Sequence, residues 1–452
     1  MPFTEDEKIV ARPITEIQDI FDRVEKYKKG SKAQSVPDIT PEMDIYAVIM
    51  FRLGHRSPFS VRLRRLLEHL FTPLEMEVFH MLKDIPMENQ AEELAKIFDM
   101  PVEQIEDILE SGFQKGVLFP KDRKTRMGYR FLPRANVQFH DGSLSNPALD
   151  LKYGPDLFNL WNDFVYYDEG YSSYLRQKNR ADNNIPYGRR VLPAYEAILE
   201  SPDADQLQPW EDGREVINCH YRWSTAFCSC RRRVSGGGFT CKRTHEHVCL
   251  NFDKAAETVI LRHGREITRE EALEKLKKAH RDGLVGSMEH YQTPNYYLLC
   301  FCCDCCCHHW APHVRQWGDY NPLWRWQKSR WEPTIDIGIC NGCVDEADGP
   351  KCVSICQFNA IEMKDLGEEG GYSGFIGAPG HEYTQKTRAV VDSEKCGGCL
   401  SCVLVCPSKA AVAHCVKPVD WVPEKPQYTR VGLTRKEGQK SGFSDVKDLY
   451  AE

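Results

Sequence analysis

Hydrophobic residues at helical spacing fill the stretch between residues 72 and 114 and predict three consecutive helices. Thr72 and Glu75 form a capping box with Pro73 at the first helical position, which fixes where the first helix begins. The apolar positions of the three helices are Leu74, Val78, Phe79 and Leu82; Leu94, Ala95 and Phe98; and Val102, Ile105, Ile108 and Leu109. Two short apolar stretches, 116–119 and 129–132, then flank a basic turn and predict a hairpin.

Three helices followed by a hairpin resemble a winged-helix domain, which we place at residues 72–135. Winged helices often bind DNA through the helix after the turn, whose surface must then suit phosphate. That helix would expose acidic side chains, which repel a duplex: Glu103, Glu106, Asp107 and Glu110. Docking to another protein is therefore favoured over nucleic-acid binding, while the basic turn 121–126 keeps DNA binding as an alternative.

The other segments differ from this unit in composition, and together they predict an α+β protein of several domains. They are a charged helical segment at 1–71, an aromatic bridging segment at 136–215, a Cys-rich domain at 216–330, a second cysteine-bearing domain at 331–420 and a polar tail at 421–452. Within the Cys-rich domain, Thr268 and Glu271 form another capping box, and the helix that they open ends at Gly283.

Length and composition allow several buried cores, because the chain has 452 residues of which 41% are hydrophobic. The formal net charge of −7 gives no whole-chain signal for nucleic acid or an anionic membrane. The N-terminus has no apolar stretch of signal-peptide type, and the longest apolar runs, such as 45–51, are too short to span a bilayer. We expect a cytoplasmic protein without a membrane span.

The strongest chemical signal is a C-x2-C-x2-C-x3-C-P run formed by Cys396, Cys399, Cys402 and Cys406 with Pro407. Three thiolates of such a run bind one iron–sulfur cluster, and the fourth binds a different one. A partner motif lies upstream, at Cys340, Cys343, Cys352 and Cys356. The crossing rule gives one [4Fe–4S] cluster to Cys340, Cys343, Cys352 and Cys406, and the other to Cys356, Cys396, Cys399 and Cys402.

This spacing resembles bacterial ferredoxins with two [4Fe–4S] clusters, so we interpret residues 331–420 as a two-cluster ferredoxin-like domain. The chain departs from the family in the eight residues between Cys343 and Cys352, and in Gln357, which replaces the usual proline. An insertion at 367–380 also lengthens the link between the motifs. A pair of zinc sites is the alternative, but zinc does not require the crossed, proline-terminated run.

Two further cysteine groups precede this domain, and all twenty cysteines lie between Cys219 and Cys415. Clustered thiols in a reducing compartment are metal ligands more often than disulfides. The first group could satisfy one [4Fe–4S] cluster, with zinc as the alternative: Cys228, Cys230, Cys241 and Cys249. Guanidinium groups of the adjoining run 231–233 would stabilise an anionic cluster and raise its potential.

The second group is the densest: Cys300, Cys302, Cys303, Cys305, Cys306 and Cys307. Adjacent cysteines point in opposite directions on an extended chain, so this tract can serve two sites. Some of its thiols would complete the cluster of the first group, and others, with Cys219, would hold a further cluster. His308 and His309 are either ligands, proton donors or polar neighbours. We therefore expect one or two more [4Fe–4S] clusters in 219–307, and no separate metal site.

The order of these features resembles winged-helix iron–sulfur proteins of strictly anaerobic bacteria and archaea. Besides the winged-helix-like unit and the ferredoxin motifs, the matching features are Cys228-x-Cys230-Arg231, Cys249 to Phe252, the helix start at 267–272, Gly283-Leu284-Val285 and the cysteines of 302–307. The resemblance covers residues 72–415 and implies electron transfer through several clusters beside a catalytic partner.

The leading hypothesis is an electron-transfer subunit that passes low-potential electrons to or from a partner oxidoreductase in anaerobic metabolism, as a homo-oligomer or within a larger complex. No flavin or NAD site is expected, because the glycines 236–238 lack the strand–turn–helix context that a dinucleotide site needs. One alternative is an iron–sulfur oxidoreductase with a substrate-binding cluster at Cys300–Cys307. The other is a redox-sensing regulator that reads DNA through the winged helix.

Overall fold

The computed structural model describes most of the chain between residues 44 and 424. The described ranges are 44–52, 61–82, 87–120, 122, 128–131, 136–167, 189–238, 241, 243, 248–308, 310, 326–343, 347–365, 374–375 and 387–424. They fall into two compact units, one ending at residue 167 and the other spanning 189–424. The predicted segment 136–215 is thus divided between the units, and the two cysteine-bearing stretches share the second unit. Most of the predicted segment 1–71 and of the tail 421–452 lies outside the described residues.

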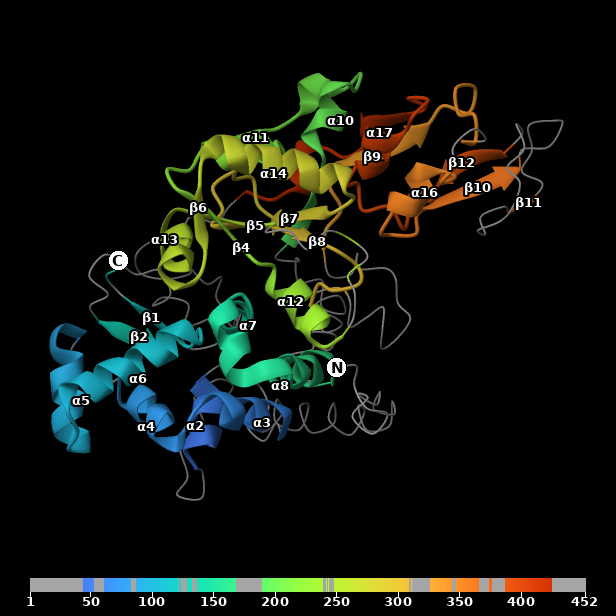
Figure 1. Ribbon diagram of the computed structural model, residues 1–452. Helices are drawn as coiled ribbons and strands as arrows, with labels where there is room; N and C mark the ends of the chain where they lie inside the picture. Colours follow the sequence, from blue (N-terminus) through green and yellow to red (C-terminus); the bar gives the residue numbers. More distant parts are fainter. Residues whose placement is uncertain are drawn as a thin grey trace, which may run out of the picture. The chain divides into compact units, whose positions relative to one another are not determined.

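The first unit is helical apart from one hairpin (Figure 1). Its elements are α2 (Ile45–Arg52), α3 (Val61–Leu70), α4 (Pro73–Met81), the short 3-10 helix η3 (Met87–Asn89), α5 (Gln90–Phe98), α6 (Val102–Gln114), β1 (Leu118–Pro120), β2 (Tyr129–Phe131), α7 (Asn136–Leu144) and α8 (Pro147–Tyr167). The Thr72 hydroxyl accepts a hydrogen bond from Glu75 N at 3.2 Å, and the Glu75 carboxylate accepts one from Thr72 N at 2.8 Å. The three helices and the hairpin follow the predicted order, and the winged-helix assignment itself stays a prediction.

The core of the first unit is aromatic and contacts a largely buried ion pair. Trp161 packs on Phe139 with ring centroids 4.8 Å apart. Lys115 Nζ lies 2.8 Å from Glu75 Oε1 and 4.6 Å from the centroid of the Phe71 ring. The capping box of α4 is thereby tied to the end of α6.

In the part of the chain that the structure describes, no helix combines the length and apolarity needed to cross a lipid bilayer.

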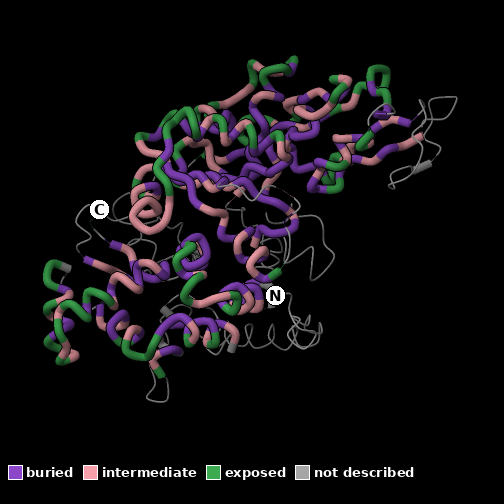
Figure 2. Tube along the Cα trace, viewed as in Figure 1, coloured by how far each residue is buried: buried purple, intermediate pink, exposed green. Residues whose placement is uncertain are grey.

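The second unit begins with a six-stranded antiparallel sheet, in the order β3-β7-β8-β5-β4-β6. Its elements are β3 (Arg189–Leu192), α10 (Tyr195–Leu199), η4 (Ala204–Gln206), α11 (Gly213–Asn218), β4 (Trp223–Ala226), α12 (Ser229–Gly236), β5 (Cys249–Phe252), α13 (Asp253–Arg262), β6 (Arg265–Ile267), α14 (Arg269–Arg281), β7 (Val285–Glu289) and β8 (Leu298–Cys302). The strands are largely buried (Figure 2). Helices α11 and α14 pack together and α14 contacts β7, while α13 packs on β4 and β5. The predicted capping box at Thr268 is present, with its hydroxyl accepting from Glu271 N at 3.1 Å.

The second unit ends in a two-stranded and a three-stranded antiparallel sheet, accompanied by two short helices. The elements are β9 (Trp331–Ile335), α16 (Lys351–Ile355), β10 (Ile361–Asp365), β11 (Gly374–Phe375), β12 (Thr387–Val391), α17 (Ser401–Val405), β13 (Ala411–Cys415) and the 3-10 helix η6 (Val419–Trp421). Strand β13 pairs antiparallel with β9, and β10 pairs antiparallel with β12 and β11. Helices α16 and α17 lie against each other, so the two cysteine motifs face one another across a pseudo-symmetric pair. The expected mixture of helix and strand is confirmed.

Candidate metal centres

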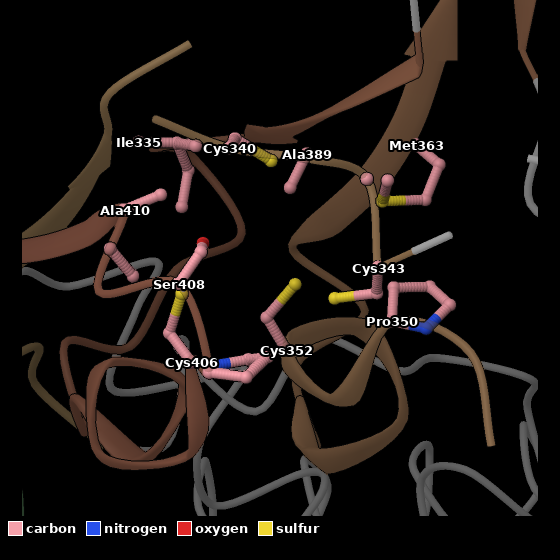
Figure 3. A pocket seen from close by; sticks show the side chains of 13 residues that line it. Ile335, Cys340, Cys343, Pro350, Cys352, Met363, Ala389, Cys406, Ser408 and Ala410 are labelled. Atoms are coloured by element: carbon pink, nitrogen blue, oxygen red, sulfur yellow. Dashed lines mark hydrogen bonds between the residues drawn. The ribbon is translucent and has the colours of Figure 1, made fainter. Parts of the chain in front are cut away.

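Four thiols from both ferredoxin motifs line one small, mostly apolar cavity (Figure 3). They belong to Cys340, Cys343, Cys352 and Cys406, and their sulfur atoms point toward the same space. The eight-residue spacer still allows Cys352 to reach the cavity, because Pro350 is the N-cap of α16 and Cys352 lies on the first turn of that helix. Ile335, Met363 and Ala389 close the walls of the cavity, so a group bound there would be shielded from water.

The second set of four thiols belongs to Cys356, Cys396, Cys399 and Cys402. Burial raises the pKa of Cys396 to about 12, and its neighbours Cys399 and Cys356 add to the shift. Burial likewise raises the pKa of Cys402, beside Cys399 and Cys396. Each motif thus contributes one thiol to the group of the other motif, as the crossing rule expects. The ligand roles themselves are taken up as proposals below.

Backbone N–H groups point at the sulfur atoms of this second set. Ala360 N donates to Cys356 Sγ at 3.3 Å, and Gly398 N donates to Cys396 Sγ at 3.4 Å. Gly398 has φ +74°, and a Cβ there would come within 2.2 Å of Trp331 O, so only glycine fits this turn. Both thiol sets therefore fit an iron–sulfur cluster, because their cysteines are largely buried, and in the second set backbone N–H groups donate to sulfur.

In the Cys-rich region, six thiols form a continuous chain of contacts that we call the six-thiol array. Its members, in order of contact, are Cys249, Cys228, Cys230, Cys307, Cys302 and Cys300. They come from β5, α12 with its N-cap, β8 and the turn after β8. Contacts with Cys230 and Cys249 lower the pKa of Cys228. His308 lies beside the array, with Nδ1 3.0 Å from Cys230 Sγ.

The sequence predicted that Cys241 would group with Cys228, Cys230 and Cys249, and the structure differs. Cys241 lies in a separate group, the tight quartet, with Cys303, Cys305 and Cys306. The chain turns at Gly238, with φ +88°, directly after α12 and before Cys241. The tract 300–307 thus serves two thiol groups, because β8 ends at Cys302 and the next residues form a turn.

Two buried arginines stand beside these groups. Arg231 Nη2 donates to Phe301 O at 3.1 Å, and Arg233 Nη2 donates to Cys306 O at 3.1 Å. Burial opposes the charge of Arg231, but the nearby thiols of Cys228 and Cys303 raise its pKa above the ordinary value. Its Nε and Nη1 are buried without a hydrogen-bond partner among the described residues. An anionic metal–thiolate group would supply the acceptors that these N–H groups lack.

Two cysteines stand apart from the thiol groups. Cys219 is an exposed residue whose thiol donates to Val216 O at 3.5 Å. Its sulfur is nevertheless partly shielded from water, and this shielding, with the nearby charge of Asp253, raises the pKa of the thiol to about 11. The expected contribution of Cys219 to a further cluster is therefore not supported by its surroundings. Cys415 Sγ accepts from Arg330 Nη2 at 3.1 Å. His309 lies outside the described residues.

Gln357 joins the ferredoxin-like domain to the Cys-rich region. In the sequence this residue stood out only because it replaces the usual proline. Its Oε1 accepts from Asp304 N at 2.7 Å, and its Nε2 donates to Cys302 O at 3.3 Å and to Gly283 O. The side chain is buried, at 3% exposed. Beside it, Cys396, Cys302 and Cys307 share one core with Trp310 and Phe358. A polar residue immediately after Cys356 was the available signal in the sequence for this bridge.

Comparison with known proteins locates the similarity at the C-terminal motifs. Residues 339–410 match the family model described as the 4Fe-4S dicluster domain. The chain is also similar to Ferredoxin-3 of Nostoc sp., with 30% identity over 81 residues that cover 17% of this chain and 75% of that protein. No solved structure matches the chain.

Proposed function

The chain belongs, through residues 339–410, to the 4Fe-4S dicluster ferredoxins, and from this premise we propose that it passes low-potential electrons to or from a partner oxidoreductase in anaerobic metabolism. Two clusters are assigned to its ferredoxin-type domain. One is held by Cys340, Cys343, Cys352 and Cys406, and the other by Cys356, Cys396, Cys399 and Cys402. A third is held within the six-thiol array. Each cluster supplies reversible one-electron chemistry.

The observation that carries the proposal is the shared core between the ferredoxin-type domain and the array. Cys396 of one site and Cys302 and Cys307 of the other belong to the same buried cluster of side chains. Trp310 lies in that core, 5.1 Å from Phe358 between ring centroids. Water is excluded from such a contact, and the Gln357 bridge fixes its geometry. A chain of redox groups needs this kind of close, rigid and dry approach.

The surrounding residues are suited to hold electrons at a defined potential. Backbone N–H groups on Cys356 and Cys396, and the buried guanidinium of Arg231, favour the more negative, reduced state. Burial of the thiols favours the less charged state and acts in the opposite direction. The N–H groups and Arg231 therefore tune the potential that the buried site would otherwise have.

A substrate-reducing enzyme is a second candidate function, favoured by the surplus of thiols. The array has six thiols, whereas one cubane cluster takes four thiolates. Cys300 at its end is only partly buried. A cluster bound there would leave a thiol unused, or an iron without a thiolate ligand, and either could bind substrate. EPR spectra that do not change with any candidate substrate or small iron ligand would contradict this role.

Iron and acid-labile sulfide counts on anoxically purified protein test the leading proposal. We expect about twelve irons per chain, because three cubes hold four irons each. A count below about eight would contradict the proposal, since the ferredoxin-type domain alone requires that number. Identification of the subunits that co-purify under the same conditions names the partner oxidoreductase.

A further inference from the structure

The tight quartet differs from every other thiol group in the spacing of its sulfur atoms. Cys241 Sγ lies 3.8 Å from Cys303 Sγ and 3.7 Å from Cys305 Sγ. Cys305 Sγ and Cys306 Sγ are 3.6 Å apart. All four sulfur atoms lie within 4.8 Å of one another, and all four residues are buried.

This spacing is the one that a single tetrahedral metal ion imposes. Zinc binds thiolates at about 2.3 Å, so the edge of a regular ZnS4 tetrahedron is about 3.8 Å. In a [4Fe–4S] cube each thiolate binds its own iron at a different corner, so the four sulfur atoms must stand further apart. Among the described residues, no other four cysteines come within 4.8 Å of one another, including both sets of the ferredoxin-type domain.

We propose that Cys241, Cys303, Cys305 and Cys306 hold one zinc ion in a closed tetrathiolate site. Four protein ligands in a buried setting leave no open position, which is the pattern of structural zinc sites. Arg243 N donates to Cys241 Sγ at 3.4 Å, as expected for a metal-bound thiolate. The site would carry a net charge of about −2, from four thiolates and one Zn²⁺, which the buried Arg231 offsets.

The zinc ion would fix the turn that separates the two thiol groups of the tract. It would tie Cys241 to the turn at 303–306, which lies between Cys302 and Cys307, two members of the array. Arg233 reinforces this arrangement by donating to the carbonyl of Cys306. The zinc site is independent of the proposed electron transfer, because it requires neither iron nor a redox partner.

Metal analysis of the full-length protein, purified anoxically, tests the proposal by mass spectrometry of zinc and iron with sulfide counts. We expect about one zinc per chain in addition to iron. Cys241→Ser should lose that zinc and retain its iron and sulfide. Cys219→Ser is the matched control, because Cys219 belongs to no thiol group, and it should retain both metals.

Three results would overturn the assignment: no zinc in the unmodified protein, loss of iron and sulfide together in Cys241→Ser, or one sulfide-free iron at the quartet. Should Cys241→Ser fail to fold, zinc-edge X-ray absorption of the unmodified protein decides the question. Four sulfur neighbours at about 2.3 Å support the site, and nitrogen or oxygen neighbours contradict it. An iron count below about eight with zinc retained would sink the electron-transfer proposal alone.

Discussion

The ferredoxin-type domain and the Cys-rich region gather their thiols in different ways. In the ferredoxin-type domain, each motif supplies three thiols from one short loop and helix, and only Cys356 and Cys406 cross over. In the Cys-rich region the thiols come from two strands, a helix and a turn, and contacting cysteines such as Cys241 and Cys305 are 64 residues apart along the chain. Local spacing therefore defines the first kind of group, whereas the sheet register and chain reversals define the second.

The two regions also differ in how closely their sulfur atoms approach. The ferredoxin-type sets are wider than the tight quartet, and the array extends as a chain of pairwise contacts. Widely spaced sulfur atoms suit clusters in which each thiolate binds its own iron, and closely spaced sulfur atoms suit four thiolates that share one metal ion. Metal type is thus expected to follow sulfur spacing, which the following substitutions test in order of expected effect.

Serine substitution at the crossing cysteines should have the largest effect. Cys356→Ser and Cys402→Ser should each remove the same cluster, with loss of about four irons per chain. Cys406→Ser should remove the other cluster. EPR spectra of the reduced proteins give the readout, and the first two variants should leave identical spectra. If Cys402→Ser instead matched Cys406→Ser, the crossed arrangement would be wrong.

Arg231→Met should lower the potential of the array. Loss of a buried positive charge and its hydrogen bonds costs roughly 1.5–3 kcal/mol, which corresponds to a fall of about 65–130 mV for one electron. A redox titration followed by EPR measures it. Arg232→Met is the control, since Arg232 is only partly buried and stacks on Phe227. Equal shifts in both variants would count against the role of Arg231.

Gln357→Leu should loosen the contact between the two regions without removing a cluster. Loss of the buried amide leaves Asp304 N and two carbonyls unpaired, at a cost of about 1–3 kcal/mol. Hydrogen exchange at Asp304 N should become faster. Gln292→Leu is matched to it, because Gln292 Nε2 donates to Val422 O at 2.7 Å and to Val419 O, and neither residue belongs to a thiol group. Unchanged exchange in Gln357→Leu would refute the bridge.

Cys219→Ser should have the smallest effect. The residue is exposed and lies outside the thiol groups, so the free energy of unfolding should stay within about 0.5 kcal/mol of the parent. Metal counts should also stay the same. Thermal unfolding and metal analysis are the measurements, and loss of iron would show that Cys219 helps to hold a cluster.

Local sequence signals predicted the local structure. Both capping boxes, at Thr72 and Thr268, were predicted because their hydrogen bonds join residues three apart. The mixture of helix and strand and the ferredoxin-type domain are likewise confirmed. The winged-helix assignment, the DNA alternative and the link to anaerobic metabolism stay predictions. On α6, Glu103, Glu106 and Asp107 are exposed, in keeping with the expected acidic surface.

Long-range features escaped the sequence because no local spacing encodes them. The grouping of Cys241 with Cys303 depends on where the chain turns after α12 and after β8. The role of Gln357 depends on Asp304 and Gly283 approaching it from other elements. The six-stranded sheet, which sets these approaches, pairs strands that are distant in the chain, such as β3 with β7.

The central claim is that the array carries a cluster of its own beside the two of the ferredoxin-type domain. The most direct test is a reductive titration followed by EPR, on the parent protein and on Cys228→Ser. We predict three reducible signals in the parent, of which Cys228→Ser lacks one and retains the two of the ferredoxin-type domain. Two signals in the parent, unchanged in Cys228→Ser, would contradict the claim.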